Sequence, residues 1–287
     1  MSIKFLGSVV AVTGAGSGIG RALAQELTQR GANLALADID TDGLAETVLL
    51  CESAMNSKAA TKVTASVLDV SDREAVEAWA AQVEEEHGRV NMIMNNAGVA
   101  LSATVAAMSY EDFEWLMNIN FWGVVYGTKA FLPYLKESGA GHVVNISSVF
   151  GLVSIPTQSA YNAAKFGVRG FTDALRMELE IEQSGVSCTT VHPGGIRTNI
   201  ARNARTDGSV LSISGTAQEL ADNFDRLTLT TPEKAARQIL KAVERNRRRV
   251  LVGPDAKVFD LVSRLPAPLY QRVLVAGSKR SWVGVKK

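Results

Sequence analysis

Short runs of β-branched and other apolar residues alternate with longer segments of helical periodicity along most of this chain. The expected strands are 9–13, 33–38, 62–69, 90–95, 142–147, 186–192 and 249–252. Helical patterns lie between them, near 19–30, 42–55, 72–87, 110–136, 159–184 and 231–246. Because parallel strands need such crossover helices, the alternation predicts an α/β fold. We expect a single doubly wound domain over residues 1–253, with a seven-stranded parallel sheet and helices on both faces.

The composition excludes several classes of function. Apolar residues make up 46% of the chain and charged residues 21%, which suits a sizeable core. The net charge of +1 leaves no global field that would draw the protein to nucleic acid. No segment has the pattern of a signal peptide or of a membrane-spanning helix. We therefore expect a soluble, cytoplasmic protein that does not bind nucleic acid.

The cysteines and histidines give no sign of a metal centre. Cys51 and Cys188 lie far apart without a CxxC partner, so they predict free thiols rather than a disulfide or a zinc site. His87, His142 and His192 are equally scattered, and we interpret them as structural or surface residues.

A glycine-rich turn follows the first predicted strand and opens the first predicted helix. It reads Thr-Gly-Ala-Gly-Ser-Gly-Ile-Gly from Thr13 to Gly20. In that position backbone amides and the positive end of a helix can cradle a pyrophosphate, and glycine lets the backbone approach it closely. The candidate dinucleotide-binding residues are Gly14, Gly16, Ser17, Gly18, Ile19 and Gly20.

Asp38 at the end of the second predicted strand indicates which dinucleotide binds. A carboxylate there can accept hydrogen bonds from the adenosine ribose hydroxyls and would repel a 2′-phosphate. The neighbouring Ile39 and Asp40 and the turn residue Ser17 are not basic, so NAD is favoured, with NADP as the alternative. Asp38 could instead begin a turn or cap the helix that starts near Asp42.

Tyr161 and Lys165 are four residues apart and share a helix face. Without other motifs, a tyrosine and a lysine at this spacing usually lie on a solvent-exposed helix face and have no catalytic role. The pKa of a free phenol is about 10. A phenol that acts as a general base at neutral pH needs a lower pKa, which a neighbouring lysine and a positive nicotinamide ring would provide. Ser148 lies thirteen residues upstream of Tyr161, directly after Ser147. Strand alternation sends the two serine side chains to opposite faces, so only one of them should face the same site as Tyr161.

Taken together, these motifs resemble the short-chain dehydrogenases/reductases, in the form with a TGxxxGxG turn and a YxxxK pair. The resemblance covers roughly residues 9–252 and rests on the glycine turn, Asp69, Asn95 to Gly98, Asn120, Ser148, Tyr161, Lys165, Pro193 and Gly194, in that order. It implies a Rossmann-type fold and a catalytic set of Asn120, Ser148, Tyr161 and Lys165, in which Ser148 rather than Ser147 would orient the substrate oxygen. Asn120 would hold a water in a proton path from Lys165, which would also bind the nicotinamide ribose.

The resemblance also implies further cofactor contacts and an oligomer. Asp69 and the Val70 backbone would hold the adenine, and Asn96, Ala97 and Gly98 would line the adenosine ribose. Pro193, Gly194, Ile196 and Thr198 would face the nicotinamide. Members of the family associate through the long helix carrying Trp115, Phe121, Trp122, Tyr126 and Phe131 and the helix that begins near Tyr161, so we expect a homodimer or homotetramer.

Two segments depart from the strand–helix rhythm. Residues 197–230 form a long polar connection that we interpret as a substrate lid. Residues 254–287 extend past the usual end of the family and are predicted to form an amphipathic helical extension, whose few basic residues argue against a membrane surface. The expected substrate lining is apolar, from Ile200, Val210, Leu211, Ile213 and Leu220 in the lid and from Phe150, Leu152, Val153 and Ile155 near Ser148.

The sequence therefore predicts an NAD-dependent oxidoreductase that interconverts a secondary alcohol and a ketone, on a hydrophobic or bulky substrate. One alternative is an NADP-dependent ketoreductase, for example of 3-oxoacyl thioesters. Another is a dinucleotide-sensing protein without turnover.

Overall fold

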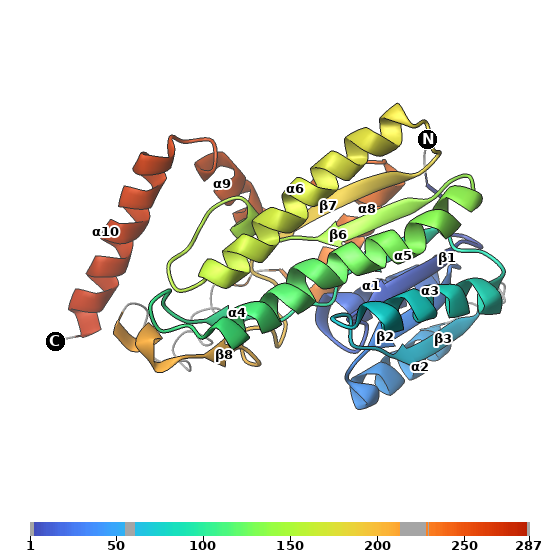
Figure 1. Ribbon diagram of the computed structural model, residues 1–287, viewed down its shortest axis with the longest axis horizontal. Coiled ribbons are helices and arrows are strands. Elements are labelled where there is room, and N and C mark those ends of the chain that lie inside the picture. The colour runs from blue at the N-terminus through green and yellow to red at the C-terminus, as the bar shows by residue number, and fades with distance from the viewer. Residues whose placement is uncertain (1–2, 55–60, 213–227, 229, 286–287) are drawn as a thin grey trace.

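A computed structural model describes residues 3–54, 61–212, 228 and 230–285, with side chains up to 276. Within them, a parallel sheet has seven strands in the order β3-β2-β1-β4-β6-β7-β9 (Figure 1). The strands are β1 (Val9–Thr13), β2 (Asn33–Asp38), β3 (Val63–Val67), β4 (Met92–Asn95), β6 (His142–Ile146), β7 (Ser187–Pro193) and β9 (Arg249–Val252). The predicted doubly wound α/β fold is confirmed.

Helices cover both faces of the sheet (Figure 1). α1 (Gly18–Gln29), α2 (Thr41–Ala54) and α8 (Pro232–Glu244) pack on one face, with Leu23, Leu27 and Leu240 fully buried. α3 (Arg73–His87), α5 (Gly123–Glu137) and α6 (Ser159–Ile181) pack on the other, where Trp79 meets Phe131 edge to face at 5.0 Å. Since β1 and β4 are buried along their whole length, they are apolar up to the polar residue that ends each strand.

The helix predicted over 110–136 is interrupted. α4 (Tyr110–Met117) passes through a π-helical turn, η1 (Asn118–Trp122), before α5 begins. The turn contains Asn120, whose amide bonds a neighbouring loop instead of solvent. A π-turn inserts one extra residue into the helix, and such turns frequently lie at functional sites.

The predicted lid is described only in part. β8 (Arg205–Thr206) pairs in parallel with β5 (Leu101–Ser102), and a short turn, η3 (Gly208–Ser212), follows. Residues 213–227 and 229, including Ile213 and Leu220 of the expected apolar lining, lie outside the described residues. The segment's return is fixed by a bridge between Ile196 and Thr230.

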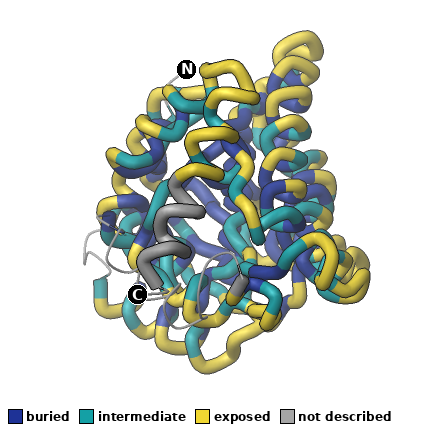
Figure 2. Tube along the Cα trace, turned by 90° about the vertical axis from the view of Figure 1, so that its left-hand side faces the viewer, coloured by how far each residue is buried: buried dark blue, intermediate teal, exposed yellow. Residues whose placement is uncertain are grey.

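The tail forms two helices. α9 (Pro254–Val262) packs against β9 and against the turn η2 (Val149–Gly151). α10 (Ala267–Val285) follows at one side of the molecule, on the left in Figure 1, and Figure 2 views the molecule from this side. Leu269, Val273 and Val275 are exposed on α10. In the described part of the chain, no helix is long and apolar enough to cross a membrane.

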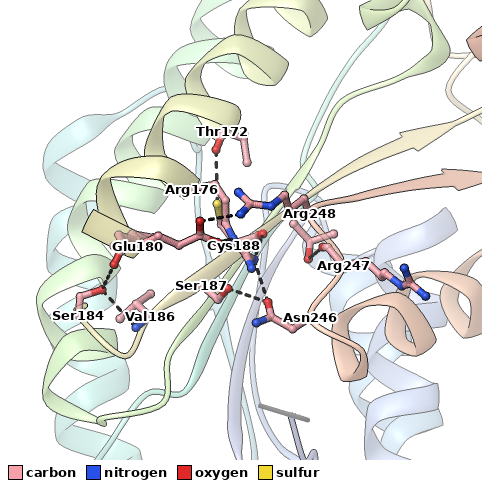
Figure 3. A network of polar contacts seen from close by, with 12 residues as sticks. Thr172, Arg176, Glu180, Ser184, Val186, Ser187, Cys188, Asn246, Arg247 and Arg248 are labelled. Carbon is pink, nitrogen blue, oxygen red and sulfur yellow. Dashed lines mark hydrogen bonds and ion pairs between the residues drawn. The ribbon is translucent and has the colours of Figure 1, made fainter. Parts of the chain in front are cut away.

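A polar network ties α6 to β7 and to the turn after α8 (Figure 3). The buried guanidinium of Arg176 donates at 2.8 Å to the Cys188 carbonyl, to Asn246 Oδ1 and to Glu180 Oε1. Arg248 donates to the other oxygen of Glu180 at 2.6 Å. The basic run from Arg245 to Arg249 is thus partly used within the fold, since Arg249 also pairs with Asp260. The network lies near the amino end of β7, away from the carboxyl ends of the strands.

Candidate active site

The glycine turn lies between the end of β1 and the start of α1. Gly14 has a φ of +66° and Gly18 a φ of +53°, conformations that favour glycine. A Cβ at Gly20 would collide with the Gly14 carbonyl oxygen, and a Cβ at Gly14 would lie 2.7 Å from Ala97 Cα. The glycines therefore allow α1 to begin directly against the backbone that follows β4.

Asp38 is held at the mouth of this turn. Its Oδ2 accepts a hydrogen bond from the Gly16 amide at 2.7 Å, and its Oδ1 accepts one from the Asp40 amide at 2.9 Å. Ile39 beside it is 66% exposed. The Leu68 amide donates to the Asp38 carbonyl at 2.9 Å, which places Asp69 and Val70 next to Asp38 at the same edge of the sheet.

The residues after β4 form a wall against the glycine turn. Thr13 Oγ1 accepts hydrogen bonds from the Asn96 amide at 3.0 Å and the Ala97 amide at 3.1 Å. The Asn96 side chain donates to the carbonyls of Thr13 and Gly14, both at 3.0 Å. Gly98 follows, and a Cβ there would lie 3.2 Å from Asn120 Oδ1 and 3.6 Å from Lys165 Nζ.

Asn120, Ser148, Tyr161 and Lys165 converge beside this wall. Asn120 exchanges two 2.8 Å hydrogen bonds with the Val99 backbone. Lys165 is buried, donates to the Ile146 carbonyl at 3.0 Å and lies 5.6 Å from the centre of the Tyr161 ring. The Tyr161 hydroxyl is hydrogen-bonded to Ser148.

The neighbouring serines face different partners, as strand alternation predicts. Ser147 donates to the Lys165 carbonyl at 2.8 Å and thereby ties β6 to α6. Ser148 lies on the other side, against Tyr161. The ring of Phe150 meets Tyr161 edge to face at 6.0 Å, whereas Leu152 and Val153 from the expected substrate lining are buried.

The loop after β7 closes the site from a third direction. The Gly194 amide donates to the Val252 carbonyl at 2.9 Å, and the Arg197 amide donates to the Thr230 carbonyl at 3.0 Å. The Thr198 methyl group lies over the start of α1, 3.0 Å from the position of a Cβ at Gly18. Pro193, Gly194, Ile196 and Thr198 are thus brought to the same edge of the sheet as the glycine turn.

Comparisons with known proteins agree with this geometry. A family model for short chain dehydrogenases matches residues 8–209. The chain belongs to the short-chain dehydrogenase/reductase family. SadH of Mycobacterium tuberculosis, an oxidoreductase by name, is 49% identical over 276 residues, 96% of each chain.

Further short-chain dehydrogenases/reductases extend the comparison. SDR family member 7B of Xenopus laevis is 34% identical, covering 95% of this chain and 82% of its own. A solved family member from Burkholderia phymatum, in complex with NAD, superposes with a TM-score of 0.83 at 30% identity and covers 91% of this chain and 94% of its own. The protein is therefore an oxidoreductase of this family, which uses a dinucleotide and a small-molecule substrate.

The turn of this short-chain dehydrogenase fits the pyrophosphate of a dinucleotide. Ser17 precedes α1 as its N-cap, but its side chain makes no capping hydrogen bond. The first amides of α1 therefore remain available to an anion. Arg21 Nη2 donates to the Gly16 carbonyl at 2.5 Å, which stabilises the turn from outside.

Burial dominates the proton affinities at the catalytic pair. It raises the pKa of Tyr161 to about 12, although the hydrogen bond with Ser148 acts in the opposite direction. It lowers the pKa of Lys165 to about 8. The predicted lowering of the Tyr161 pKa is wrong for the protein alone, because desolvation outweighs the hydrogen bond with Ser148. The prediction also includes a positive nicotinamide ring, a charge that the protein does not supply.

Two residues at the site escaped the sequence analysis. His192 was interpreted as an ordinary residue, yet its Nδ1–H donates to the Ser148 carbonyl at 2.9 Å, and burial lowers its pKa to about 4. Asp255, in the tail, accepts a hydrogen bond from Gly195. The sequence feature that comes closest to indicating a role for His192 is its position directly before Pro193. Among the described residues, no group of three or more His, Cys, Asp or Glu could hold a metal ion.

Proposed function

We propose that the protein is an NAD(H)-dependent dehydrogenase that interconverts a secondary alcohol and a ketone. The observation that carries this proposal is the convergence of Asn120, Ser148, Tyr161 and Lys165 beside the wall that faces the glycine turn. NAD, when bound, accepts or returns the hydride. The protein's own residues must bind the two reactants, orient them and move one proton.

Tyr161 is the proposed general acid/base. Its hydroxyl already shares a hydrogen bond with Ser148, so a substrate oxygen that lies between them would be bound by both. Ser148 then stabilises the charge that develops on that oxygen, and Tyr161 takes or gives the proton. Lys165, fixed by the Ile146 carbonyl, would hold the ribose of the cofactor and favour the phenolate.

Asn120 would hold the proton path open behind Lys165. The Asn120 side-chain amide forms two hydrogen bonds with the Val99 backbone. Because Gly98 has no side chain, the space between Asn120 and Lys165 stays open. The π-turn explains how a helix can present an asparagine in this position. This proposal includes the water molecule that Asn120 would hold in the proton path from Lys165, as the resemblance to the family implies.

The preference for NAD rests on the acidic edge of β2. The Asp38 carboxylate is fixed by Gly16 and Asp40, and Asp42 follows in the first turn of α2. A 2′-phosphate would meet this concentration of negative charge. We expect kcat/KM to be higher with NAD than with NADP, and Asp38→Ser combined with Ile39→Arg to reverse the preference. A clear preference of the wild-type enzyme for NADP would favour the ketoreductase alternative.

The substrate is proposed to be hydrophobic. Phe150 lies against Tyr161, and Leu211 of the turn after β8 is 56% exposed. Such side chains can bind an apolar group. A panel of secondary alcohols, steroids and hydroxyacyl compounds, followed by NADH absorbance, tests this proposal. Activity confined to small polar alcohols would contradict it.

The decisive variant is Tyr161→Phe, which removes only the phenolic oxygen. We expect turnover to fall roughly 10²-fold or more while NADH binding stays nearly unchanged. Val105→Ala, at a side chain that is 76% exposed, is the control and should keep full activity. Near-normal turnover of Tyr161→Phe would refute the mechanism. If the wild-type protein binds NADH but turns over no member of the panel, the dinucleotide-sensing alternative is favoured.

A homodimer completes the proposal. An apolar stripe on α6 is uncovered in the single chain, with Phe166 37%, Met177 56% and Ile181 82% exposed. Trp122, 43% exposed, stacks on Tyr126 of the neighbouring α5. These faces match the helices through which family members associate. A monomeric mass in sedimentation velocity would refute the dimer.

The free, buried thiols of Cys51 and Cys188 are consistent with the proposed cytoplasmic location.

A further inference from the structure

Asp255 connects the C-terminal tail to the loop that follows β7. It lies in the first turn of α9, and its Oδ2 accepts a 2.6 Å hydrogen bond from the Gly195 amide. A Cβ on Gly194 would collide with both carboxylate oxygens, and a Cβ on Gly253 would lie 2.6 Å from Oδ1. Two glycines therefore leave the room that this partly buried carboxylate occupies.

The helix that carries Asp255 is fixed to the body of the protein. Asp260, one turn further along α9, is 8% exposed and forms ion pairs with Arg249 of β9 at 2.8 Å and with Arg264 at 3.0 Å. Ala256 is fully buried. The helix also packs on η2, the turn directly after Ser148. Asp255 thus meets the loop from a rigid support.

The loop itself needs such a support. Gly194 and Gly195 have no side chains to restrict their conformation, and glycine loses more conformational freedom on ordering than any other residue. Their backbone is held by the Val252 carbonyl on one side and by Asp255 on the other. If Asp255 is removed, the Gly195 amide loses its partner.

We propose that Asp255 is a positioning residue that fixes the Gly194–Gly195 backbone and thereby shapes the nicotinamide half of the cofactor site. The inference rests on the proposed function, because it assumes that this loop faces the nicotinamide. It assigns the first helix of the tail to the active site. Asp255 does not touch the reacting atoms, so its effect reaches the reaction only through the loop.

Binding of two ligands by calorimetry separates the two halves of the site. ADP-ribose contains the adenosine, the pyrophosphate and the second ribose of NAD⁺ but lacks the nicotinamide. For Asp255→Ala we expect the Kd of NAD⁺ to rise roughly tenfold, while the Kd of ADP-ribose changes less than about twofold. Asp255→Asn keeps an oxygen acceptor for Gly195 and should recover most of the NAD⁺ affinity. Glu74→Gln, at an exposed first-turn acid of α3, is the control and should change neither Kd.

A second pair of variants tests the contact without relying on a single substitution. Gly194→Ala forces a methyl group into the Asp255 carboxylate, so it should weaken NAD⁺ binding strongly in the wild-type background. In the Asp255→Ala background the same change should cost much less, because the colliding atoms are gone. Such non-additivity identifies direct coupling between the residues.

Three results would overturn the inference. Unchanged NAD⁺ affinity in Asp255→Ala would show that the loop is held without the carboxylate. Equal loss of NAD⁺ and ADP-ribose binding, or additive effects of the two substitutions, would show that Asp255 supports the fold as a whole. If Gly194→Ala weakens ADP-ribose binding as much as NAD⁺ binding, the assumption that this loop faces the nicotinamide is refuted. Failure of the wild-type protein to bind either ligand would instead refute the proposed function, on which the inference rests.

Discussion

His142 should make the folded state sensitive to mild acid. Its ring is completely buried on β6, with Nε2 2.9 Å from Thr189 Oγ1. Burial, with a smaller effect of the Arg176 charge, lowers its pKa to about 3. The unfolded chain has an ordinary histidine value of about 6.5, so it takes up a proton before the folded state does. The stability that the neutral ring supports is therefore complete above about pH 6.5 and is lost as the pH falls toward 3.

The size of this loss follows from the two pKa values. Below about pH 6 each further pH unit costs about 1.4 kcal/mol, so the loss from His142 at about pH 5 is about 2 kcal/mol. His142→Gln removes the titrating group and can retain a hydrogen bond to Thr189. Its free energy of unfolding should be lower at neutral pH but should fall about 2 kcal/mol less than that of the wild type between about pH 7.5 and pH 5.

Urea unfolding at the two pH values, followed by circular dichroism, measures this difference. His87→Gln is the matched control, since His87 is only partly buried at the end of α3 and its pKa is lowered less. The control should therefore retain most of the wild-type pH dependence. If His142→Gln loses stability with acid as steeply as the wild type, the buried ring is not the cause, and the reasoning from burial to pH dependence fails.

Two further substitutions test the site and the fold. Gly98→Ala brings a methyl group 3.2 Å from Asn120 Oδ1, which must shift by a few tenths of an ångström. We therefore expect kcat to fall roughly tenfold. The control is Gly170→Ala on α6, where a methyl group would have nothing within 4 Å and should leave kcat unchanged. Arg176→Met removes the three hydrogen bonds that the buried guanidinium donates and should lower the free energy of unfolding by about 3 kcal/mol. Arg248→Met, at a side chain 59% exposed that pairs with the same Glu180, should cost at most about 1 kcal/mol. Equal effects within either pair would contradict the corresponding argument.

The sequence predicted the layers of the fold well because the signals are local. Strands such as β1 and β2 are mostly apolar runs, and the helices between them have an amphipathic period, so both can be recognised without knowing what they touch. The glycine turn is equally local, since its strand, turn and helix are consecutive. Alternation along a strand allows only one of Ser147 and Ser148 to face the site, and the thirteen-residue spacing to Tyr161, which matches the family, selects Ser148.

What the sequence could not give depends on residues distant along the chain. The π-turn at Asn120 has no separate signature within a continuous helical pattern. Asp255 meets Gly195 across 60 residues, and no spacing rule joins them. The Tyr161 pKa was predicted from neighbouring charges alone, whereas its value depends on how completely the fold removes water. Burial of that kind is a property of the packed structure.

The pairing of β5 with β8 has a consequence for redesign. β8 and the Ile196–Thr230 bridge join the described ends of the predicted lid to the rest of the protein by backbone hydrogen bonds. Backbone amides and carbonyls are present whatever the side chain, so these contacts do not depend on which side chains the ends carry. Exposed side chains at these ends, such as Arg205 and Thr206, can therefore be exchanged in redesign without removing the backbone contacts that hold the ends in place.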